Sequence, residues 1–179
     1  MKMKVYITLL IATISLCSAA QSLPQQPVTT SAEVIEAYSI KAVDKVAEFY
    51  NYVELITDPS LSAEMREHTA TEAVKLFENP GIKVYDIFST EGKLIPLKDF
   101  IAKCLVQKSK LILTATSAEA RVIQPGNTSQ VWLVKYNLQI GNTKPISLQQ
   151  YFTVQLERKK FGDTVKNVRS TYLGNCSIK

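Results

Sequence analysis

The sequence predicts an α+β domain in which N-terminal helices pack on one face of a mainly antiparallel sheet. Up to about residue 80, apolar residues recur with a helical period. Two later stretches, 131–140 and 146–156, instead alternate apolar and polar residues, which is the period of a strand with one buried face. Only short turns separate the C-terminal stretches, and short turns make successive strands antiparallel neighbours. Helices first and a sheet last therefore define the expected fold class.

The first twenty residues have the organisation of a secretory signal peptide. Lys2 and Lys4 form a short basic segment, an apolar run follows over residues 5–17, and Ser18-Ala19-Ala20 supplies the small residues of a cleavage site. Because the run is short for a membrane span, we expect an exported protein, periplasmic or extracellular, that is free of the membrane after cleavage. An uncleaved membrane anchor is the alternative. Residues 21–31 are then expected to form a flexible tail, and residues 32–179 a single domain.

Two proline-containing turns divide the helical part. Thr30 and Glu33 have the spacing of a capping box, so a first helix is expected to begin near residue 31 or 32 and to continue to about residue 56. The segment 58–60 (Asp-Pro-Ser) interrupts this pattern. A second helix is expected over about 62–78, because the segment 79–81 (Asn-Pro-Gly) ends it.

The remaining elements are expected to be a first strand, one short helix and three or four longer strands. Residues 82–88 have the composition of a strand, and Pro96 suits the first turn of a helix that continues to about Val106. Longer strands are expected over about 111–123, 131–140, 146–159 and 164–173, with turn residues between them. The polar faces of the two alternating strands would meet water or a partner. A twisted sheet around a long helix would leave a conical interior.

This order of elements resembles the nuclear transport factor 2-like (cystatin-like) superfamily, which includes many exported bacterial proteins of unknown role. The resemblance covers roughly residues 32–174 and rests on element order, since no diagnostic motif is present. It implies a cone-shaped fold with a pocket between the helices and the concave face of a curved sheet. It also implies frequent dimers through the outer face of the sheet. Members include ketosteroid isomerases, polyketide cyclases, dehydratases and non-catalytic binding modules.

Composition excludes several classes of function. The chain carries a formal charge of +5, part of which belongs to the signal segment, and this excess is too small to indicate nucleic-acid binding. Few residues suit a metal: beyond the signal segment there are two cysteines and one histidine, without recognisable ligand spacing. No cofactor is therefore expected. The histidine, His68, lies in a charged helical stretch, where exposure to solvent is a simpler interpretation than proton transfer.

The two cysteines of the expected domain could form a disulfide or remain free thiols. An oxidising compartment permits a disulfide between Cys104 and Cys176. Cys104, however, lies on the apolar face of the helix expected over 96–106, where a buried free thiol is equally consistent with the pattern.

Binding of a small molecule is the function that the residues favour. Five side chains combine apolar surface with a few polar groups, as the linings of ligand pockets do: Tyr50, Trp132, Tyr136, Gln150 and Phe152. The alternative is that they fill the core. Gln150 interrupts an apolar face, and a buried amide requires hydrogen-bond partners, which a ligand could supply. We therefore expect an accessory protein that binds an apolar or partly polar molecule without catalysis.

Two other functions remain open. The polar outer face of the sheet could form a protein interface, including a homodimer. Alternatively, Asp86 is a weak candidate for the base of an isomerase or dehydratase, because an acid among apolar neighbours can acquire a shifted pKa. Tyr38 or Tyr50 could then supply a phenolic donor.

Overall fold

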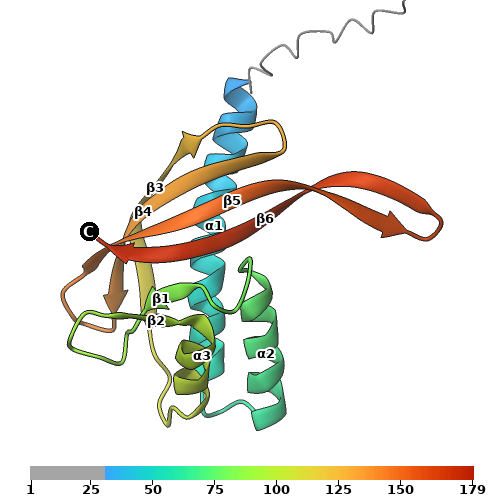
Figure 1. The fold of residues 1–179 in the computed structure, drawn as a ribbon. Helices are drawn as coiled ribbons and strands as arrows, with labels where there is room; N and C mark the ends of the chain where they lie inside the picture. The colour runs from blue at the N-terminus through green and yellow to red at the C-terminus, as the bar shows by residue number, and fades with distance from the viewer. Residues whose placement is uncertain (1–30) are drawn as a thin grey trace, which may run out of the picture.

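A computed structural model describes residues 31–179, in which three helices pack against a four-stranded antiparallel sheet beside a small two-stranded sheet (Figure 1). The α+β class expected from the sequence is confirmed. The expected signal segment 1–20 and all but the last residue of the expected tail 21–31 lie outside the described residues. Within residues 31–179, no helix is both long enough and apolar enough to span a membrane.

The helices begin and end close to the expected positions: they are α1 (Ala32–Thr57), α2 (Ala63–Lys75) and α3 (Leu97–Leu105). Serine side chains cap the first two, because Ser31 accepts a hydrogen bond from the backbone of Val34, and Ser62 does the same from Met65. Helix α2 ends earlier than expected, since the chain after it pairs with the sheet. The backbone carbonyl of Leu76 accepts a hydrogen bond from the Leu173 amide at 2.8 Å.

The main sheet has the strand order β3-β4-β5-β6, and every neighbouring pair is antiparallel. Its strands are β3 (Leu113–Gln124), β4 (Ser129–Ile140), β5 (Ile146–Phe161) and β6 (Thr164–Ile178). Strand β6 continues past its expected end because the β5–β6 ladder shifts register between Gln150 and Phe152. Gly174 lies at this irregularity, where a Cβ atom would approach the Tyr151 Cβ to 2.9 Å.

The small sheet contains β1 (Lys83–Tyr85) and β2 (Leu94–Pro96), which are antiparallel. The strand expected over 82–88 is therefore much shorter, and β2 was not expected. The reason is a turn at Asp86, whose side chain accepts a hydrogen bond from the backbone of Phe88 at 3.1 Å. The Asp86 carbonyl also accepts from Ser89, so the chain bends away before the strand can continue.

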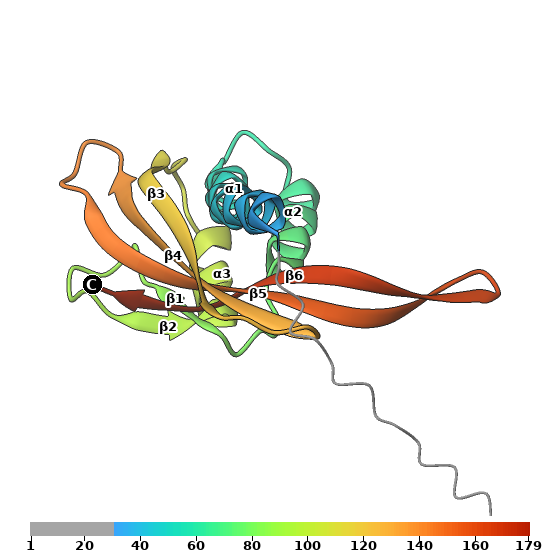
Figure 2. The ribbon, with the colours of Figure 1, turned by 90° about the horizontal axis from the view of Figure 1, so that it is seen from above.

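The helices lie together against one part of the sheet (Figure 2). The buried side of α1 starts at Ala42 and continues through Val46, Phe49, Val53 and Ile56. The first residues of α1 extend beyond α2 and α3 and stand beside β3 and β4 alone (Figure 1). Strand β3 is an edge strand that contains two irregularities, one of which places Ser117 at a φ of 52°.

Candidate functional site

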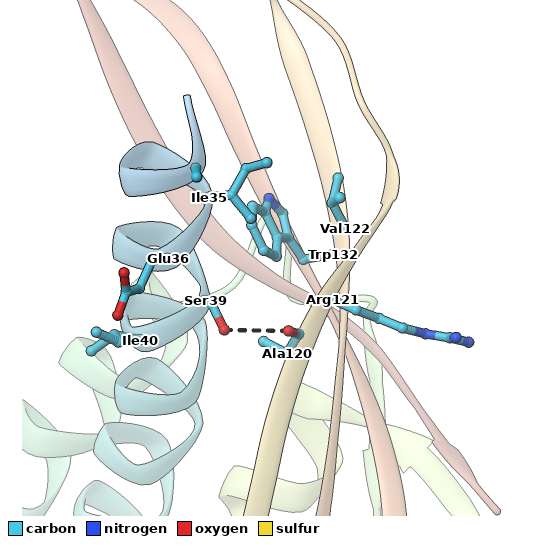
Figure 3. A pocket seen from close by; sticks show the side chains of 9 residues that line it. Ile35, Glu36, Ser39, Ile40, Ala120, Arg121, Val122 and Trp132 are labelled. Carbon is cyan, nitrogen blue, oxygen red and sulfur yellow. Dashed lines mark hydrogen bonds between the residues drawn. The ribbon is translucent and has the colours of Figure 1, made fainter. Parts of the chain in front are cut away.

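A cleft of about 630 Å³ opens between the first turns of α1 and the strands β3 and β4 (Figure 3). Its walls are mostly apolar. The lining residues are Ala32, Ile35, Glu36, Ser39 and Ile40 from α1, Ala120, Arg121 and Val122 from β3, and Trp132 from β4. The polar ends of Arg121 and Glu36 point away from the space between helix and strands (Figure 3). The volume lies within the range of small-molecule sites.

The cleft exists because the end of α1 has a neighbour on only one side. Ser39 joins the two walls, since its hydroxyl donates a hydrogen bond to the carbonyl of Ala120 at 3.2 Å (Figure 3). A second hollow of about 400 Å³ shares Ser39, Ile40 and Ala120, and continues toward Val43 and Ala118. The two hollows therefore lie along one seam between α1 and β3.

Trp132 lines the cleft, and its indole nitrogen is buried without a hydrogen-bond acceptor in the described part of the chain. The side chain is only 1% exposed, and its indole Nε1 has no hydrogen-bond partner among residues 31–179. Figure 3 shows Nε1 at the edge of the ring that faces Ile35. A buried donor without an acceptor costs roughly 1–3 kcal/mol, so an acceptor supplied here would be stabilising. The Tyr38 ring also lies near the indole, with 6.4 Å between ring centroids.

Two of the five predicted ligand-binding residues instead form a hydrogen-bonded pair in the core. The hydroxyls of Tyr50 and Tyr136 are 2.9 Å apart, and the Cys176 thiol lies next to Tyr136. Burial raises the pKa of both phenols, so they stay protonated near neutral pH. Tyr136 also borders a small polar hollow of about 140 Å³ near Lys179. Neither residue lines the α1–β3 cleft.

Gln150 and Phe152 also lie away from the cleft. The Gln150 amide donates a hydrogen bond to the carbonyl of Gly174, at the irregularity in the β5–β6 ladder. The hydrogen-bond partner of Gln150 is therefore another residue of the protein and not a ligand. Phe152 is fully buried in the core. Of the five residues that the sequence selects, the structure brings only Trp132 to the cleft.

Asp86, the weak candidate base, is fully buried and has both carboxylate oxygens engaged. Oδ2 accepts a hydrogen bond from the Lys103 ammonium at 2.7 Å, and Oδ1 accepts from the Phe88 amide. Since Lys103 lies on α3, this ion pair ties the turn after β1 to that helix. Asp86 lines none of the clefts described here, so its contacts support a structural role. His68 is exposed on α2.

Cys104 and Cys176 are both buried free thiols in the structure. Burial and the nearby Asp86 raise the pKa of Cys104 to about 12. Burial raises the pKa of Cys176 to about 11. Neither thiol is therefore a reactive thiolate near neutral pH. Residues 31–179 also contain no group of three His, Cys, Asp or Glu side chains placed to hold a metal ion.

Sequence reasoning missed the helical wall of the cleft. In the first turns of α1 the apolar residues Val34, Ile35 and Ile40 are 40%, 39% and 57% exposed. The available signal was Ile40, which falls outside the helical face that Ala42, Val46 and Val53 share. An apolar residue outside the core stripe can mark a binding surface.

Comparison with protein-family models, with curated proteins and with solved structures gives no match for this chain.

Proposed function

We propose that the protein binds a small, largely apolar molecule with one hydrogen-bond acceptor in the cleft between α1 and β3–β4. The observation that carries the proposal is Trp132, whose buried Nε1 has no partner at a cleft with apolar walls. Apolar surface would supply the affinity and the indole N–H the orientation, as in other small-molecule sites. Nε1 is shielded from solvent, so the acceptor reaches it when Ile35, which is 39% exposed, moves aside.

We also propose the cone-shaped fold that the sequence suggested. α1 and a curved sheet would form the walls of a cone, as in the nuclear transport factor 2-like superfamily, and the cleft would be its open end. The protein would act after export as a binding or accessory protein rather than as an enzyme. This fits Asp86, the candidate base, which forms a buried ion pair with Lys103 and lies away from the cleft.

Fluorescence provides a direct test because Trp132 is the only tryptophan in the chain. We expect 2-nonanone, an apolar chain with one carbonyl acceptor, to change the emission of Trp132 in a saturable way. Ala120→Phe places a ring in the cleft and should abolish this response. Ala47→Phe is the control, since Ala47 is exposed on α1 and does not line the cleft. Equal responses of the two variants would refute the site.

Calorimetry tests separately whether the Trp132 indole N–H binds the acceptor of the ligand. Trp132→Phe should weaken binding of 2-nonanone about three- to tenfold, which corresponds to the net free energy of one hydrogen bond. A longer-chain ketone and the alcohol of the same length should show the same loss. If Trp132→Phe binds as tightly as the wild type while Ala120→Phe does not bind, the cleft is a purely apolar site.

A further inference from the structure

Charge is distributed very unevenly along this chain. Residues 31–80, which contain α1 and α2, carry ten acidic and four basic side chains. Residues 158–169, at the far end of the β5–β6 hairpin, carry five basic side chains and one acidic one. The two regions therefore have net charges of −6 and +4, whereas the whole chain has only +5. Opposite charge is thus concentrated on separate parts of the molecule.

The end of the β5–β6 hairpin, Leu156–Arg169, is a two-stranded arm that projects away from the body (Figures 1 and 2). Leu156, Phe161 and Val165 on the arm are 41%, 52% and 52% exposed. The arm continues a ladder whose inner part is buried in the core. Nothing in residues 31–179 packs over its outer part, so its side chains are free to meet another molecule.

One face of the arm is basic and apolar without any acid. Cross-strand partners point to the same face, and the pairs here are Leu156 with Arg169, Arg158 with Asn167, and Lys160 with Val165. None of these three basic side chains forms an ion pair among the described residues. The arm's one ion pair, Lys159 with Glu157, belongs to the opposite face.

The outer side of the α1–α2 layer has the complementary character. Six of its carboxylates form no ion pair within residues 31–179: Glu33, Glu36, Asp44, Glu48, Glu64 and Glu67. Exposed apolar residues lie among them, including Ile40 at 57% and Met65 at 53%. Both surfaces therefore combine exposed apolar side chains with an excess of charge of one sign.

We propose that two copies of this chain associate by placing the arm of each across the α1–α2 layer of the other. The arm cannot reach its own helices in this way, since it projects away from them (Figure 2). Five residues separate Leu156 from the tip, a reach of about 17 Å, which spans two adjacent helices whose axes lie roughly 8–10 Å apart. A reciprocal exchange closes after two copies and so forms a dimer rather than a chain of molecules.

Two variants, one with reversed charges on the arm and one with reversed charges on the helices, test this pairing. The arm variant carries Arg158→Glu, Lys160→Glu and Arg169→Glu. The helix variant carries Glu48→Lys, Glu64→Lys and Glu67→Lys. Sedimentation velocity at low salt should show a dimer for the wild type and a monomer for either variant alone, because like charges then face each other. An equimolar mixture of the two should restore the dimer, since each arm again meets a layer of opposite charge.

The control variant, Lys98→Glu, Lys108→Glu and Lys144→Glu, changes the net charge by the same amount as the arm variant. These three side chains are exposed and lie outside the arm, so the control should dimerise like the wild type. High salt should dissociate the wild-type dimer. A wild-type monomer at every concentration would overturn the proposal, as would a dimer that persists in both single variants. Binding of monomeric wild type to phosphatidylglycerol vesicles or to duplex DNA would instead assign the arm to that partner.

Discussion

The two halves of α1 have very different surroundings. In the closed half, Val46–Ile56, the side chains of Phe49, Val53 and Ile56 are at most 3% exposed and contact helices as well as strands. In the open half, Ala32–Ile40, only β3 and β4 stand beside the helix, and its apolar residues remain partly exposed (Figure 1). One helix thus provides core packing at one end and a cleft wall at the other. Stability and binding should therefore respond to different substitutions.

Removing a large core side chain from the closed half should have the largest effect. The Phe49 ring lies 4.8 Å from the Phe77 ring and 5.9 Å from the Phe100 ring, measured between centroids. Phe49→Ala should lower the free energy of unfolding by about 3–5 kcal/mol, because it removes buried surface and leaves a cavity. Ile40→Ala in the open half should cost less than about 0.5 kcal/mol. Denaturant titration measures both, and similar losses would contradict the distinction.

Alkaline pH should weaken the core that the closed half shares with Cys104 of α3. The folded protein holds the Cys104 proton until about pH 12, whereas the unfolded chain releases it near pH 9.0. Stability from this group is therefore complete below pH 9.0 and falls as pH rises toward 12. The slope approaches about 1.4 kcal/mol per pH unit for one such group. In Cys104→Ala, denaturant midpoints should decline less steeply over this interval, and an unchanged slope would contradict the assignment.

The hydrogen bonds at the two ends of α1 should differ less in their contribution to the free energy of unfolding. Tyr136→Phe leaves the buried Tyr50 hydroxyl without its partner, which should cost about 1–2 kcal/mol. Ser39→Ala removes a partly buried bond at the cleft, where water can replace it, and should cost only a few tenths of a kcal/mol. Thermal unfolding of the two variants compares them directly. A larger loss for Ser39→Ala would mean that this bond holds the walls of the cleft together.

The sequence carried enough local information for most of the fold. Alternation over 131–140 and 146–156 predicted strands that the structure contains. The Thr30–Glu33 spacing and the proline-containing turns located the helix ends within a few residues. The short strand β2 escaped notice because three residues ending at Pro96 show no periodicity. The extension of β6 past Gly174 depends on a register shift against β5, which is a relation between strands and leaves no period in either.

The site was harder to predict than the fold, and for a physical reason. A pocket lining and a core use the same residue types, so Tyr50, Tyr136 and Phe152 could not be assigned to one or the other from composition. The positions at which α2 and α3 end decide whether such a residue lines the cleft or lies in the core. Trp132 lines the cleft because α2 and α3 do not reach it, whereas Tyr136, on the same face of β4, lies under the closed half.

The irregular edge of the main sheet has a consequence for how copies of this protein can meet. Strand β6 has its outer edge covered at Leu173 by Leu76 and Glu78, whereas no described strand pairs with the outer edge of β3. A long regular edge would offer a template to strands of other chains and promote aggregation. Ser117, with its φ of 52°, and the two register shifts break β3 into short pieces. Uncontrolled growth of the sheet from chain to chain is thereby suppressed, although that edge stays uncovered.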